Sequence, residues 1–319
     1  MSTSERYLFL LIGVVLFVYL LLRASLVTIV GDEAATFFHY IFPKEFIPGI
    51  ARRGANNHLL NSIIATELSS IFGYSAFVLR LGNLLSFPLY LFFIYKFIGE
   101  LKNIILRWIL FFGLSTAVLI EFFALCRGYG MSFAFLLGSC WFLYSASRNS
   151  KPHFFFLSSL FILFGVAANM TLINTAIIVV GLSTILLVIN YGQSKSRKLL
   201  LWAGLTIVLG ITGISYFSSI ALKLHGSGLL YLGNKTNFWD TTLNSIGQSL
   251  THSAFIFRWV FLGLCIFIII ERGVAIWKSA KASALLSPTT LLTTLFFGNI
   301  IATILLTTLF EVNYPIARA

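Results

Sequence analysis

"YLFLLIGVVLFVYLLLRASLVTIVGDE", residues 7–33, decides the fold class, because a long apolar run ends directly in two acidic residues. A helix needs about 20 apolar residues to cross the hydrocarbon core of a bilayer, and residues 7–30 supply them. The run follows Arg6 as a signal peptide would, but its core is too long and lacks a small-x-small cleavage site. We therefore predict a retained membrane anchor.

The composition extends this prediction to the whole chain. The 319 residues are 58% hydrophobic and 10% charged, with a mean hydropathy of +0.94, whereas soluble domains carry roughly 25% charged residues. No stretch is polar enough to form a soluble domain. We expect one integral membrane domain over 1–319, an all-α polytopic transmembrane helical bundle. Its nine predicted spans are 7–30, 81–98, 104–124, 129–147, 153–169, 174–191, 199–221, 253–271 and 289–310.

The net charge of +12 reports topology. Cytoplasmic loops collect Lys and Arg, so the excess does not indicate nucleic acid as a partner. Short loops on alternate connections hold Arg6, Lys96, Lys102, Arg107, Arg148, Lys151, Lys195, Arg197, Lys198, Arg272, Lys278 and Lys281. This bias predicts a cytoplasmic N-terminus.

The three cysteines are scattered and form neither a disulfide framework nor a metal-binding spacing. No cofactor is expected with certainty, and a divalent metal stays open without being indicated.

Two predicted outer loops are long, at about 31–80 and 222–252. In the first, residues 57–72 form an amphipathic pattern, which predicts a helix lying on the outer surface with His58 and Asn61 toward water or substrate. The alternative is a tenth span, but that would invert every later loop and lose the charge bias.

Asp32 and Glu33 admit two interpretations. Asp32 could cap a short helix, since Asp accepts hydrogen bonds from free N–H groups at helix starts, and Glu33 would then only match the helix dipole. Alternatively, one carboxylate is a general base, held at the membrane surface within reach of a lipid-borne substrate. The pair alone does not decide between them.

Neighbouring stretches favour a functional site. "ARRGANNHLLNS", residues 51–62, combines two arginines suited to phosphate with amide and imidazole groups suited to hydroxyls. Arginines there could instead snorkel toward lipid head groups, and a lone His is more often structural. Arg80 and Arg127 enter spans from the same side, and "KLHGSGLLYLGNKTNFWDTT", residues 223–242, adds aromatic and amide groups suited to sugars. The candidate binding residues are Arg52, Arg53, Asn56, Asn57, His58, Asn61, Arg80, Arg127, Tyr129, His225 and Arg318.

These stretches resemble the GT-C glycosyltransferases that use polyprenyl-phosphate-linked sugars. The branch that the chain resembles holds protein O-mannosyltransferases and lipid A aminoarabinose transferases. The likeness rests on "GDEAATFF" (31–38), "NNHLLNSIIATELSSIFGYSAFVLRLGN" (56–83), "CRGYGMS" (126–132) and "NYPIAR" (313–318), in this order and on one predicted side of the membrane. Many relatives carry His-Pro-Pro where this chain has His58-Leu59-Leu60. The family also continues through more spans after the last motif, so the resemblance predicts a C-terminally truncated copy.

The resemblance implies an inverting membrane glycosyltransferase in the inner (plasma) membrane of a bacterium. Its donor would be a lipid-linked sugar and its acceptor a glycan, lipid or protein hydroxyl at the outer face. The family assigns the base to the Asp that matches Asp32, and Glu33 would orient the acceptor or Asp32. Arginines suit the phosphate leaving group, which needs its charge neutralised. The alternatives are a lipid or sugar transporter, although transporters place more charges inside spans, and a structural membrane protein.

Overall fold

The computed structural model describes residues 1–46, 57–149, 151–227, 237–251, 253–279 and 287–310, and these residues form helices without any strand. The all-α prediction is confirmed. The helices are α1 (Thr3–Leu26), α2 (Gly31–Thr36), α3 (Leu59–Phe72), α4 (Ala76–Glu100), α5 (Ile104–Leu114), α6 (Ala117–Glu121), α7 (Tyr129–Asn149), α8 (Pro152–Ala168), α9 (Ile173–Ser194), α10 (Arg197–Gly226), α11 (Asn244–Thr251), α12 (Ala254–Ser279) and α13 (Pro288–Phe310). Short π turns (Phe37–Ile41 and Trp239–Leu243) and 3-10 turns (Phe122–Ala124 and Met170–Leu172) join some of them.

Seven helices of the described chain are long and apolar enough to span a membrane, so the protein is a multi-pass membrane protein. They correspond to seven of the nine predicted spans. The predicted span at 104–124 is broken: α5 and the segment Ala117–Ala124 meet at a bend of 49°. The predicted span at 153–169 corresponds to α8, an apolar helix of 17 residues.

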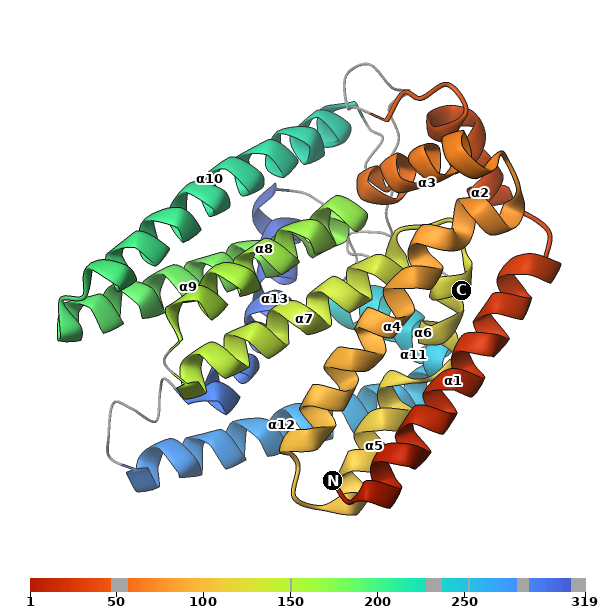
Figure 1. Cartoon of the computed structure of the whole chain (residues 1–319). Coiled ribbons are helices and arrows are strands. Elements are labelled where there is room, and N and C mark those ends of the chain that lie inside the picture. The colour runs from red at the N-terminus through yellow and green to blue at the C-terminus, as the bar shows by residue number, and fades with distance from the viewer. Residues whose placement is uncertain (47–56, 150, 228–236, 252, 280–286, 311–319) are drawn as a thin grey trace. The chain divides into compact units, whose positions relative to one another are not determined.

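The chain divides into two compact units, each with its own core. The first contains Met1–Trp141, Leu160–Ile173 and Thr212–Leu224. In it, α4 packs against α1, α3 and α5, and the two short elements α2 and α3 lie at the end of α1 that Leu26 closes (Figure 1). Its core is aromatic and aliphatic, with Phe9, Leu20, Leu84, Phe87 and Phe123 almost completely buried.

The second unit contains Phe142–Ser159, Asn174–Ile211 and His225–Ala319. Its core includes Leu143, Phe155, Leu187 and Leu291. Large apolar side chains on α12, including Phe255, Trp259 and Phe267, are exposed, as expected for a helix that faces lipid.

Charges near the ends of spans are paired within each unit. Arg23 contacts Glu121 at 3.3 Å in the first unit, and Arg258 contacts Asp240 at 3.0 Å in the second. Pairing lowers the cost of keeping these groups at membrane depth. Arg23, Glu121 and Arg258 all fall within predicted spans, at 7–30, 104–124 and 253–271.

Helix α3 forms over the predicted residues, but its polar face packs into the protein, whereas the sequence predicted that this face points toward water or substrate. Asn61, Ser62, Ala65, Thr66 and Ser69 are buried, whereas its larger apolar side chains are partly or fully exposed. Two of the buried hydroxyls on this face have partners: Thr66 Oγ1 donates to the Ser62 carbonyl of the same helix at 2.7 Å, and Ser62 Oγ donates to Asn57 Oδ1 at 3.2 Å. The prediction was that His58 and Asn61 face water or substrate. Its first alternative was wrong, because the two side chains are 4% and 1% exposed and this face packs into the protein. Its second alternative stays a prediction.

Candidate functional site

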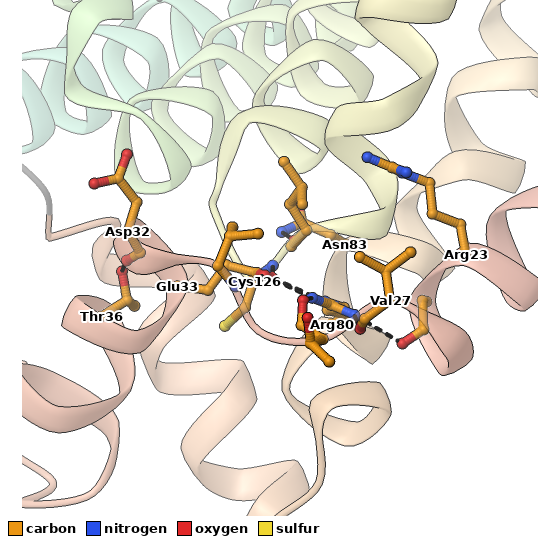
Figure 2. A network of polar contacts seen from close by, with 12 residues as sticks. Arg23, Val27, Asp32, Glu33, Thr36, Arg80, Asn83 and Cys126 are labelled. Carbon is orange, nitrogen blue, oxygen red and sulfur yellow. Dashed lines mark hydrogen bonds and ion pairs between the residues drawn. The ribbon is translucent and has the colours of Figure 1, made fainter. Parts of the chain in front are cut away.

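Asp32 and Glu33 occupy different environments although they are neighbours. Both lie in the first turn of α2, where successive side chains point about 100° apart. Figure 2 shows Asp32 turned away from the cluster in which Glu33 meets Arg80. Glu33 is completely buried, whereas the Asp32 side chain is 47% exposed.

Glu33 is fully engaged by hydrogen-bond donors. Its Oε1 accepts from Arg80 Nε at 2.8 Å and from the Cys126 N–H at 2.5 Å, and its Oε2 accepts from Arg80 Nη2 at 2.6 Å and from the Val30 N–H at 3.2 Å. Burial alone would raise the pKa of Glu33, but these bonds hold it below its ordinary value. The carboxylate is thus ionised and saturated, which suits a structural role.

Arg80 uses all five of its N–H donors inside the protein. Besides Glu33, it donates to the backbone carbonyls of Ala24 (3.0 Å), Val27 (2.6 Å) and Thr28 (3.0 Å) (Figure 2). Its side chain is completely buried. A guanidinium has five N–H groups and none is left for a ligand. The expectation that Arg80 binds substrate is therefore replaced by a structural role: it ties the end of α1 to α2 and α4.

The capping interpretation also changes. The residue before α2 is Val30, whose side chain cannot cap, and the carboxylate that accepts its backbone N–H is that of Glu33. The Asp32 side chain is not the cap of this helix, and its backbone carbonyl accepts a hydrogen bond from the Thr36 hydroxyl at 3.0 Å. Of the two acids, Glu33 rather than Asp32 accepts the hydrogen bond at the start of α2, so the capping role predicted for Asp32 belongs to Glu33.

Asp32 instead faces Arg127. Its Oδ2 lies 2.6 Å from Arg127 Nη1, and the Arg127 side chain is 11% exposed. The guanidinium lies over the ring of Tyr129, 4.9 Å from the centroid, and Nη2 is 3.4 Å from the Tyr129 hydroxyl. This arrangement gives an accessible carboxylate beside a cation that an aromatic ring supports.

The same loop holds both acids. Glu33 binds the backbone of Cys126, and Asp32 binds the side chain of the next residue, Arg127. Asn83 fixes this loop further: its amide Nδ2 donates to the carbonyls of Leu125 and Arg127, and its Oδ1 accepts the Met131 N–H at 2.9 Å. The buried contacts of Glu33 and Asn83 with this loop therefore fix the position at which Asp32 and Arg127 meet.

His58 packs against this loop. It is 4% exposed, its ring lies 4.8 Å from that of Tyr129 in an edge-on geometry, and its Nδ1 is 2.9 Å from the Ala168 carbonyl. Gly128 makes the approach possible, because a Cβ there would lie 1.9 Å from that carbonyl oxygen. Burial, together with the charge of Arg127, lowers the pKa of His58 to about 4.

The other candidates are distributed as follows. Asn57 donates to the Phe46 carbonyl at 3.0 Å and accepts from Ser62, and Asn61 accepts from Asn83 at 2.9 Å. His225 is exposed near the end of α10 and belongs to the second unit. Arg52, Arg53, Asn56 and Arg318 lie outside the described residues.

The sequence interpretation missed Asn83 and the backbone partners, Cys126 N–H and the Ala168 carbonyl. Asn83 could have been noticed as the one amide side chain in the predicted span 81–98. Backbone partners such as the Cys126 N–H cannot be recognised in this way, because every residue type other than proline carries the same backbone groups. Over the described residues, no group of three or more His, Cys, Asp or Glu is placed to hold a metal ion.

No protein-family model, no curated protein and no solved structure matches the chain.

Proposed function

We propose that this membrane protein is a glycosyltransferase of the GT-C kind. It would move a sugar from a polyprenyl-phosphate donor to an acceptor hydroxyl on a glycan, lipid or protein. The observation that carries the proposal is the accessible Asp32 carboxylate 2.6 Å from Arg127, next to a Glu33 that is buried and saturated. The adjacent acids thus divide into one that supports the structure and one that is open to chemistry.

In the proposed reaction, the acceptor oxygen attacks the anomeric carbon of the sugar. The bond from that carbon to the phosphate oxygen breaks, and its electron pair leaves with the polyprenyl phosphate. The acceptor proton passes to the Asp32 carboxylate, acting as general base. The sugar configuration inverts in this single displacement.

Arg127 suits the leaving group. Polyprenyl phosphate gains negative charge as the bond breaks, and a guanidinium can neutralise that charge with paired N–H donors. In the structure the same guanidinium pairs with Asp32. A phosphate that shares Arg127 weakens the hold of Arg127 on Asp32, so donor binding would prepare the base.

The site is proposed to face outward from a bacterial inner membrane. The charge bias of the loops supports this orientation, because it predicts a cytoplasmic N-terminus and therefore the Leu26 end of α1 on the outer side. Lipid-linked donors and envelope acceptors meet at such a surface.

Complementation of a deletion strain tests the proposal. Mass spectrometry of envelope lipids and glycans should show a sugar missing from the deletion strain and restored by the unaltered protein. Asp32→Asn should fail to restore it at normal protein level, with a rate loss of about 10²–10⁴. Arg127→Ala should weaken binding of donor lipid.

Asp240→Asn is the matched control, because Asp240 is also a half-exposed Asp paired with an arginine, Arg258, but lies in the second unit. It should restore the sugar. A deletion strain that lacks no sugar modification would refute the proposed function. Restoration by Asp32→Asn would remove Asp32 as the base.

A further inference from the structure

The His58 ring carries a buried nitrogen that the described residues leave without a hydrogen-bond partner. A carbonyl oxygen only accepts, so the Nδ1 that contacts the Ala168 carbonyl at 2.9 Å must carry the proton. In the neutral ring, Nε2 is then a bare acceptor. Nε2 is buried and has no partner among the described residues.

Such an orphan is costly. An unsatisfied buried polar atom typically costs about 1–3 kcal/mol, and the great majority of buried polar side-chain atoms in proteins have partners. A group that stays unpartnered beside a candidate site is therefore an acceptor available to a ligand.

Its surroundings define the ligand group. Tyr129 contacts the His58 ring, with centroids 4.8 Å apart, and also lies under the Arg127 guanidinium. The charges of Arg127 and Asp32 both act on His58, so all three are neighbours. A phosphate oxygen cannot donate to a bare nitrogen, and an ammonium group would meet the cation of Arg127. A neutral hydroxyl satisfies both conditions.

We propose that His58 Nε2 accepts a hydrogen bond from a hydroxyl of the lipid-linked sugar, while Arg127 holds the phosphate of the same donor. This inference rests on the proposed function and adds a sugar-reading group to it. His58 becomes a specificity residue that binds the sugar ring and takes no part in proton transfer.

The first test observes the nitrogen directly. NMR spectra are recorded of the full chain, labelled with ¹⁵N-histidine, in lipid nanodiscs. Spectra with added undecaprenyl phosphate are compared with spectra with added undecaprenyl-phosphate-linked glucose, mannose or arabinose. The resonance missing from His58→Asn identifies His58. We expect at least one sugar-bearing lipid to shift the Nε2 signal toward the hydrogen-bonded position, and undecaprenyl phosphate to leave it unchanged.

The second test uses binding. His58→Asn keeps an amide N–H at the position of Nδ1, for the Ala168 carbonyl, but lacks the ε nitrogen. It should bind that sugar lipid about tenfold more weakly, the equivalent of one hydrogen bond, and bind undecaprenyl phosphate as before. Arg127→Ala should weaken both ligands. His153→Asn, in the second unit, should change neither.

Three results would overturn the inference: equal shifts with undecaprenyl phosphate alone, an Nε2 already hydrogen-bonded to a buried water and unmoved by any sugar lipid, or no sugar lipid that binds more tightly than undecaprenyl phosphate. The proposed function fails separately. If a sugar lipid shifts the Nε2 signal but no sugar lipid ever acts as a donor, the His58 subsite is supported and the proposed transferase activity is refuted. If His58→Asn transfers the sugar fully and binds the donor with unchanged affinity, the transferase activity is supported and the His58 subsite is refuted.

Discussion

Glu33 and Arg80 form a two-bond ion pair, at 2.8 and 2.6 Å, with no exposed surface on either side chain. Glu33→Gln would leave the guanidinium buried without its counter-charge. Loss of one partner of a buried pair typically costs about 3–5 kcal/mol, so we expect a large fall in the free energy of unfolding, measured by denaturant titration in detergent.

Glu121→Gln is the comparison for that measurement. Glu121 also pairs with an arginine, Arg23, but its side chain is 40% exposed. Partly exposed pairs contribute about 1 kcal/mol or less. If Glu33→Gln and Glu121→Gln lowered the free energy of unfolding equally, the buried Glu33–Arg80 ion pair would contribute no more to stability than an exposed one.

Gly128→Ala should damage the site by steric overlap. The new Cβ would lie 1.9 Å from the oxygen and 2.8 Å from the carbon of the Ala168 carbonyl, and 3.0 Å from the His58 Cβ. Backbone atoms cannot swing aside as a flexible side chain can, so we expect at least the 1–3 kcal/mol typical of overpacking. Thermal unfolding in detergent measures the loss.

Gly31→Ala provides the matched control in the same unit. No atom lies within 4 Å of a Cβ built at Gly31, in the first turn of α2 and next to Asp32. Its thermal midpoint should stay level or rise slightly, because Ala favours helix more than Gly does. A comparable loss in both variants would show that backbone freedom, rather than the contact with Ala168, makes glycine necessary at 128.

The sequence predicted the elements far better than the orientation of their polar faces. Runs of apolar residues suffice to predict membrane helices, and α1, α4 and α7 form where they were expected. The inward turn of α3 was not predictable in this way, since small hydroxyl side chains such as Thr66 can bond to their own helix and be buried.

The division of labour between Asp32 and Glu33 was equally hidden. Their partners, Arg127 and Arg80, are 95 and 47 residues away in the chain. Nothing local indicates which acid meets which arginine. The family resemblance singled out Asp32 as the base, and the structure leaves Asp32, rather than Glu33, exposed; whether Asp32 acts as a base stays a prediction.

Acid should destabilise the protein through His58. Burial first, and the charge of Arg127 second, lower its pKa from 6.5 to about 4, so between these values the unfolded chain binds a proton that the folded chain does not. Stability therefore falls as the pH drops through this window, by about 3 kcal/mol at most for this group. His58→Asn should remove this share from a series of thermal midpoints between pH 7.5 and 4.

The protonation of Glu33 also makes the protein less stable as the pH falls, and this contribution remains in the His58→Asn variant. Its pKa is lowered in the folded state, so its stabilising contribution is present above its unfolded value and is lost as the pH falls through the folded value. The pH dependence of His58→Asn should thus become shallower without vanishing. An unchanged slope would mean that His58 is accessible to protons in the folded protein.

Membrane orientation is open to a labelling test. The charge bias predicts that Lys151, between α7 and α8, faces the cytoplasm, and that α3 lies on the opposite side. Glu67 on α3 and Lys151 are both exposed, so cysteines placed there can react. The native Cys126 and Cys265 are buried and Cys140 is intermediate, and all three are replaced by alanine first.

A membrane-impermeant maleimide added to intact cells should label Glu67→Cys and leave Lys151→Cys unlabelled until the membrane is permeabilised. Labelling of Lys151→Cys from outside would reverse the orientation, because the two positions are separated by three predicted crossings: α4, the bent α5–α6 pair and α7. Such a reversal would put Asp32 and Arg127 at the cytoplasmic surface. The donor lipid would then have to present its sugar on the cytoplasmic side, and an envelope acceptor could no longer reach the base.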